Sequence, residues 1–170
     1  HEGSGTRFLV IGYGNPGRLD DGLGPALAAR LQAAALPAVS VEADYQLQVE
    51  DAEAISRHDV VVFADAAVAG ASPFAVSEVQ PRRGVSFSSH SLDPDEVLGL
   101  AHDLFHATAR GFALGIRGYE FDEFGERLSP GATRNLDEAA AFLLSVLTSS
   151  DVAALVQRAR SPGTPGPCSA

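Results

Sequence analysis

The stretch that decides the fold is Phe8–Gly24, FLVIGYGNPGRLDDGLG, near the start of the chain. It opens with four apolar residues in unbroken succession, a pattern typical of a parallel strand covered on both faces. Gly12 and Gly14 follow and allow a sharp turn, because a glycine has no β-carbon to obstruct it. The stretch therefore predicts a buried strand, a glycine-rich turn and the beginning of a helix.

Two adjacent carboxylates, Asp20 and Asp21, stand where this turn meets the helix. A carboxylate just outside a helix can accept a hydrogen bond from a backbone N–H that has no partner inside the helix. We expect Asp20 to take this capping position. Asp21 is then left without an evident structural role and becomes the first candidate for a functional residue.

The rest of the chain alternates between strand-like and helix-like patterns. Strands are expected at 7–11, 38–43, 59–65, 74–79 and 111–118, and helices after Asp20, at 49–56, after Asp93 and at 133–147. This alternation predicts an α/β fold of the phosphorylase/hydrolase-like kind, a three-layer α/β/α sandwich on a mostly parallel sheet of about five strands. Pro81 and polar neighbours place strand 74–79 at an edge. The helix after Asp93 is expected to turn these residues toward the core: Val97, Leu98, Ala101, Leu104 and Phe105.

Length and composition limit the organisation of the chain. The 170 residues suit one domain, expected over 6–150, with a C-terminal extension at 151–170 that is mobile from about 161. A net charge of −10 argues against nucleic acid as a partner, and no apolar run is long enough to span a membrane. The single cysteine, Cys168, predicts a reducing, cytoplasmic compartment, and its place in the mobile tail makes it a poor nucleophile.

Three residues from separate segments form the candidate site. In open α/β sheets, ligands bind beyond the carboxyl ends of the strands, where Asp21 and Asp65 are both expected. His90 lies in a serine-rich segment that could fold over them. Two carboxylates and an imidazole suit a divalent metal such as zinc or nickel. A structural alternative stays open, in which Asp21 favours the helix N-terminus, Asp65 caps a turn and His90 is an ordinary loop residue.

Two other motifs suggest different chemistry. GYGNPG is similar to a dinucleotide fingerprint, but Arg18–Asp21 separate its last glycine from the helix, and the two carboxylates would repel a pyrophosphate. His102 and His106 have the spacing of a zinc pair on a helix. Asp103, however, stands where a metalloprotease carries its catalytic glutamate. Nucleotide binding and a zinc-protease helix are therefore both disfavoured.

Four blocks of sequence together resemble the NiFe-hydrogenase maturation endopeptidases. They are GYGNPGRLDDGLG, VVVFADA, SFSSHSLDPDEVLGLA and ALGIRGYEFDEFGERLSPG, which span about Arg7 to Leu147. Members of that family remove a short C-terminal extension from the precursor of a hydrogenase large subunit after nickel has been inserted into it. The resemblance implies the same endopeptidase activity and the same class of partner.

The resemblance also implies roles for the candidate residues. Asp21, Asp65 and His90 match the family's nickel-binding and catalytic positions. No permanent cofactor is then expected; the nickel belongs to the substrate, with zinc or cadmium able to occupy the site in vitro. Peptide hydrolysis could use a metal-polarised water or carbonyl, or a carboxylate as general base.

One departure from the family and two alternative functions remain. Many members carry a D-G-G-T-x-G turn where this chain has Asp44–Gln48, DYQLQ, which implies a different large subunit as partner. A peptidyl-tRNA hydrolase-like esterase shares a G-x-G-N-P-G turn, but it follows the turn with T-R-H-N, whereas this chain has Arg18–Asp21. A non-catalytic chaperone that senses nickel-loaded partners is the second alternative.

Overall fold

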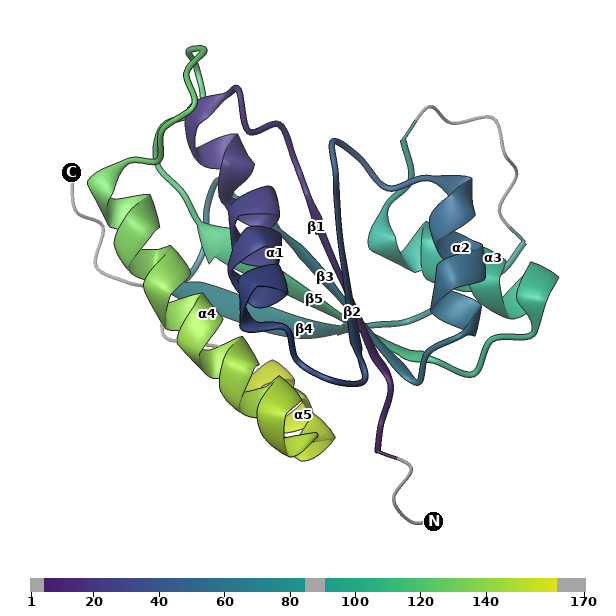
Figure 1. Cartoon of the computed structure of the whole chain (residues 1–170). Helices are drawn as coiled ribbons and strands as arrows, with labels where there is room; N and C mark the ends of the chain where they lie inside the picture. The colour runs from purple at the N-terminus through teal and green to yellow at the C-terminus, as the bar shows by residue number, and fades with distance from the viewer. Residues whose placement is uncertain (1–4, 85–90, 162–170) are drawn as a thin grey trace.

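The computed structural model describes residues 5–84 and 91–161, which form a five-stranded sheet with helices on both faces (Figure 1). The strands are β1 Phe8–Tyr13, β2 Val39–Asp44, β3 Val60–Ala67, β4 Phe74–Val79 and β5 Arg110–Arg117. The helices are the 3₁₀-helix η1 Leu19–Gly22, α1 Leu23–Ala34, α2 Val49–Ser56, α3 Pro94–Phe105, α4 Pro130–Ser149 and α5 Val152–Arg160.

The sheet has the strand order β2-β1-β3-β5-β4. Neighbouring strands run parallel except β4, which lies antiparallel to β5 at one edge. The predicted three-layer α/β/α fold and the edge position of strand 74–79 are both confirmed.

Two apolar clusters, one on each face of the sheet, explain the unbroken hydrophobic run of β1. Phe8 and Val10 point to the face covered by α1, α4 and α5, whereas Leu9 and Ile11 point to the face covered by α2 and α3 (Figure 1). All four side chains are at most 1% exposed. A strand buried on both sides needs apolar residues at consecutive positions, because successive side chains point to opposite faces.

The strand order reverses between β1 and β3. From β1 the chain passes through α1 to β2 on one side, and β3 pairs with the other side of β1. In open α/β sheets, such a switch point leaves a crevice beyond the carboxyl ends of the two strands. The turn that carries Asp21 and the end of β3 that carries Asp65 therefore meet at this crevice.

Two details of the helices differ from the sequence-based expectation. Leu104 and Phe105 are 49% and 40% exposed, so the expectation that they face the core is wrong. They lie in the last turn of α3, whereas the buried positions of this helix run from Val97 to Ala101. Helix α5 was not expected at all, yet its Leu155 is fully buried.

The tail from residue 162 onward lies outside the described residues, so its expected mobility stays a prediction. Within the described ranges, no helix is both long and apolar enough to cross a membrane.

Candidate carboxylate site at the β1–β3 switch point

Asp65 lies near the end of β3, on the sheet face covered by α2 and α3. Its Oδ1 atom accepts a hydrogen bond of 2.7 Å from the backbone N–H of Ala66, and the Tyr13 hydroxyl hydrogen-bonds to the same carboxylate. Burial is the main reason that the pKa of Asp65 rises to about 6, and the nearby charge of Asp21 raises it further. The two hydrogen bonds act in the opposite direction and only partly offset this effect.

Asp21 belongs to η1 and fastens the glycine-rich turn. Its Oδ2 atom accepts a hydrogen bond of 2.9 Å from the backbone N–H of Asn15, whose own Oδ1 accepts one of 2.9 Å from Gly17. Asp21 therefore has a structural role that the sequence did not reveal. The carboxylate is only partly buried and interacts electrostatically with Asp65. The structure thus brings Asp21 and Asp65 to the same crevice.

Gly14 allows the turn to close over Asp21. It has a φ of +138°, and a Cβ atom at this position would lie only 2.2 Å from the backbone oxygen of Asp21. Any other residue would displace η1. This glycine therefore positions the carboxylate of Asp21 in the crevice. The glycine-rich turn thus has a structural reason that does not involve a nucleotide.

The third candidate, His90, lies outside the described residues. The described chain resumes at Ser91, and Leu92 then forms an isolated antiparallel β-bridge with Leu47. Asp93, one residue further on, is close enough to raise the pKa of Tyr13, after the larger contributions of burial and of Asp65. The beginning of α3 therefore borders the same crevice, while the role of His90 stays a prediction.

Asp20 does not cap α1, so that expectation is wrong. The residue before α1 is Gly22, because η1 intervenes between the turn and the helix. The Asp20 side chain is instead fully buried. It accepts hydrogen bonds of 2.7–2.9 Å from four donors: the backbone N–H groups of Tyr119, Glu120 and Ser129, and the Ser129 hydroxyl. Burial tends to raise its pKa, but these bonds outweigh it and the pKa is lowered.

Tyr13 is a site residue that sequence reasoning missed. It is the last residue of β1 and points to the same sheet face as Leu9 and Ile11. The alternation of side chains along the strand is the signal that could have found it. Burial, followed by the charges of Asp65 and Asp93, raises its pKa, so the hydroxyl stays protonated and can donate to Asp65.

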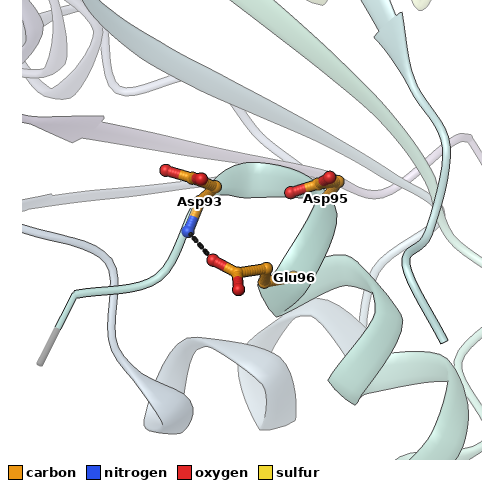
Figure 2. A group of neighbouring side chains, drawn as sticks. All are labelled: Asp93, Asp95 and Glu96. Atoms are coloured by element: carbon orange, nitrogen blue, oxygen red, sulfur yellow. Dashed lines mark hydrogen bonds between the residues drawn. The ribbon is translucent and has the colours of Figure 1, made fainter. Parts of the chain in front are cut away.

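A second acidic group lies at the N-terminus of α3, as Figure 2 shows. Asp93, Asp95 and Glu96 each offer a ligand atom within 4.8 Å of the others, the one such group in the described part of the chain. Glu96 accepts a hydrogen bond of 2.8 Å from the Asp93 backbone, as one half of a capping box (Figure 2). Asp93 therefore caps α3, and carboxylates at a helix N-terminus need no metal to explain them.

The two histidines of α3 do not form a zinc pair. The Nε2 atom of His102 lies 3.1 Å from the carbonyl oxygen of Ala109, and His106 ends the helix with a φ of +56°. Asp103 pairs with Arg83 instead of facing a metal. The prediction that this helix is not a zinc-protease helix is therefore consistent with the structure.

The paired carboxylates can perform two kinds of chemistry. A carboxyl group with a pKa near 6 can exchange a proton close to neutral pH, as a general base must. Two carboxylates that share a crevice also attract a divalent cation, whose charge would relieve their mutual repulsion. Titratable groups with strongly shifted pKa values in a crevice are typical of functional sites.

The fold is similar to that of three solved structures. The NiFe hydrogenase maturation protease HycI from Thermococcus kodakarensis KOD1 has a TM-score of 0.67 and 22% identity, over 85% of this chain and 94% of that protein. The hydrogenase 2 maturation peptidase from Thaumarchaeota archaeon SCGC_AB-539-E09 has a TM-score of 0.62 and 19% identity, over 83% and 97%. The hydrogenase maturating endopeptidase HybD from E. coli has a TM-score of 0.59 and 19% identity, over 85% and 94%.

No protein-family model matches the sequence, and no curated protein matches it either. At the identities given above, the comparisons show a shared fold. The resemblance to the hydrogenase maturation endopeptidases is thus confirmed at the level of the fold.

Proposed function

We propose that this protein is an endopeptidase that removes the C-terminal extension from the precursor of a NiFe-hydrogenase large subunit after nickel insertion. The observation that carries the proposal is the meeting of Asp21 and Asp65 in the β1–β3 crevice, on a fold shared with hydrogenase maturation proteases. These are two of the three residues that the sequence resemblance assigns to nickel recognition.

In this proposal the nickel is part of the substrate. Asp21 and Asp65 bind it through carboxylate oxygens, and His90 supplies an imidazole nitrogen. When both are ionised, the carboxylates of Asp65 and Asp21 repel each other. A docked cation offsets this repulsion and stabilises the ionised pair. A precursor without nickel lacks this contribution, and metal recognition therefore selects mature substrates.

Each carboxylate also has a hydrogen bond that holds it in place. The backbone N–H of Asn15 orients Asp21, and the N–H of Ala66 orients Asp65. Peptide hydrolysis then uses a metal-polarised water or carbonyl, or a carboxylate as general base. Tyr13 donates to Asp65 and thereby positions it.

The proposal is tested by incubating the protein with a nickel-loaded precursor and measuring the intact mass of the precursor. We expect loss of a C-terminal peptide with the wild-type protein and no loss with Asp21→Asn, which keeps an acceptor for Asn15 but removes the charge. Asp137→Ala is the matched control. Asp137 lies in α4, and its exposed carboxylate forms a surface salt bridge with Arg30.

The outcome separates the alternatives. Full trimming by Asp21→Asn would contradict the assignment of Asp21. Binding of the nickel-loaded precursor without any loss of mass would support the nickel-sensing chaperone. Cleavage of a peptidyl-tRNA instead of the precursor would support the esterase, although the net charge of −10 disfavours an RNA substrate.

A further inference from the structure

A groove crosses the start of α1 beside the glycine-rich turn. It consists of two pockets, of about 230 Å³ and about 340 Å³. Both pockets are lined by Pro16 and Pro25, so they lie side by side along the start of α1. We call this depression the proline groove. The smaller pocket extends to the end of β2 and the larger one to the segment 126–128.

The proline groove begins next to the carboxylate site. Gly14 lines the smaller pocket, and the position of a Cβ atom on Gly14 lies 3.7 Å from Oδ1 of Asp21. A chain lying in the groove would therefore pass within reach of the proposed nickel ligand. The groove and the crevice share the turn between β1 and η1 as a common wall.

The size and lining of the groove suit an extended peptide. Binding sites for small molecules and cofactors typically enclose about 300–1,000 Å³. Each pocket is at or below the lower end of this range, so each accommodates a side chain or two. The floor is apolar because it consists mainly of proline, glycine and alanine. At its rim, the ring of Tyr45 is 70% exposed and is free to pack on a bound chain.

The charges at the Tyr45 end favour a basic partner. Asp44 lines the smaller pocket, and the carboxylates of Glu42, Asp44 and Glu50 all act on Asp51, whose pKa is raised by burial first and by these charges next. Of these four carboxylates, Asp44 lines the pocket, and the other three lie near it, around the end of β2 and the start of α2. A positively charged side chain of a bound peptide would be attracted here.

We propose that the proline groove binds the C-terminal segment of the substrate protein in an extended conformation. An apolar side chain of the segment occupies the pocket beside Tyr45, and a basic side chain lies near Asp44. This inference rests on the proposed endopeptidase function and adds the surface that holds the peptide while Asp21 and Asp65 engage the nickel. It also gives the DYQLQ turn a role, because Asp44 and Tyr45 are its first two residues.

The test fills the smaller pocket without disturbing the core. Ala43 is an exposed residue of β2 that lines this pocket, so Ala43→Trp places an indole where the peptide side chain would bind. Ala153→Trp is the matched control, because Ala153 is an exposed alanine on α5, which packs on the far edge strand β4. Tyr45→Ala is the second variant; because Tyr45 is 70% exposed, the change removes little packing from the folded protein.

The measurement is the steady-state trimming of the nickel-loaded precursor at low and high ionic strength. Ala43→Trp should raise KM by about tenfold or more with kcat within about twofold, Tyr45→Ala should raise KM less, and Ala153→Trp should match the wild type. KM of the wild type should rise with ionic strength, because salt screens the attraction between Asp44 and the basic side chain.

Each outcome decides between the two proposals. Wild-type trimming together with unchanged KM values for Ala43→Trp and Tyr45→Ala would overturn the peptide groove and leave the endopeptidase function standing. A KM that is independent of ionic strength would overturn the basic partner. If the wild-type protein does not trim the precursor, both the function and the groove inference fall.

Discussion

Asp20 and Asp21 are adjacent in the sequence, yet their carboxylates face opposite surroundings. Asp20 is fully buried and accepts four hydrogen bonds from the segment 119–129, whereas Asp21 is partly exposed and faces the crevice. Within the described residues, the Asp21 carboxylate accepts one hydrogen bond, from the backbone N–H of Asn15 to Oδ2, which leaves Oδ1 available to a ligand. Asp20 therefore stabilises the fold, and Asp21 is the residue to which the proposed chemistry is assigned.

Asp20→Asn should be strongly destabilising. The asparagine replaces one acceptor oxygen by an NH₂ group that points at N–H donors, and we expect a loss of roughly 3 kcal/mol in the free energy of unfolding. Urea denaturation measures this loss. Because the folded-state pKa of Asp20 is lowered, its contribution is present above the ordinary value of 3.8 and disappears as the pH falls through the folded-state pKa. A variant as stable as the wild type at pH 7 would contradict this role.

Asp65→Asn should have the opposite effect on stability while abolishing trimming. The folded-state pKa of about 6 lies above the ordinary 3.8, so above pH 6 the folded protein bears the cost of ionising a buried carboxyl group. The difference corresponds to roughly 3 kcal/mol, which partial exposure to water reduces to about 1–2 kcal/mol. Asparagine keeps an acceptor for Ala66 and removes the charge.

The stability that Asp65→Asn gains over the wild type should depend on pH, and this dependence serves as a control. Near pH 4 the carboxyl group of the folded wild type is protonated, so the stability difference between wild type and Asp65→Asn should shrink toward zero. Chemical denaturation at pH 7.5 and pH 4 checks both values. A loss of stability in Asp65→Asn at pH 7.5 would show that the buried charge is fully compensated.

At the scale of elements, the backbone of α1 lies directly against the ends of two strands. A Cβ atom on Gly24 would lie 2.3 Å from the carbonyl oxygen of Tyr13 and 2.6 Å from that of Ala64. Gly12 makes the reverse contact, since its Cβ position is 2.1 Å from the carbonyl oxygen of Gly24. This close approach holds η1, and with it Asp21, above the crevice.

Gly24→Ala should therefore displace α1 from the sheet. The methyl group would overlap two backbone oxygens that cannot move aside, and we expect a loss of about 3 kcal/mol or more together with reduced trimming. Gly115→Ala is the matched control. Its Cβ atom would meet only the Cβ of Ala67, at an ordinary 3.4 Å, so stability should change by less than about 1 kcal/mol. Thermal denaturation of both variants measures the difference.

The sequence predicted elements better than it predicted contacts across the chain. In the part of the chain that the structure describes, periodicity found all five strands and four of the five α-helices, because it reports which face of each segment is buried. It also placed Asp21 and Asp65 at strand ends. It could not find the partners of Asp20, which lie about 100 residues further along the chain, nor the hydrogen bond between Tyr13 and Asp65. Such long-range contacts depend on the tertiary structure and leave no periodic signal.

Helix α5 was missed for a related reason. Its segment, Val152–Arg160, has only nine residues, and Leu155 is its one fully buried side chain. A nine-residue segment with one fully buried position gives too short a periodic pattern to be recognised. The helix is stabilised by its contacts with β4 and α4, which only the folded structure reveals.

For the whole molecule, the structure separates the β1–β3 crevice from the edge that α5 closes. The crevice lies between β1 and β3, whereas α5 covers β4, two strands away from β3. Leu155 of α5 is fully buried in the cluster that also contains Phe74. The guanidinium of Arg158 lies 4.2 Å from the centre of the Phe74 ring, a cation–π contact that holds the helix in place.

Leu155→Ala should therefore reduce stability without changing the chemistry. Removing a fully buried leucine side chain costs about 2–4 kcal/mol, because it loses apolar contacts and leaves a cavity. Gln157→Ala, on the exposed side of the same helix, should change stability by less than about 0.5 kcal/mol. Below its unfolding transition, Leu155→Ala should trim the nickel-loaded precursor with kcat and KM within about twofold of the wild type, since distant sites act independently. A large change in kcat with intact folding would show that α5 is coupled to the crevice through β4 and β5, and that the sheet transmits strain from one edge to the site.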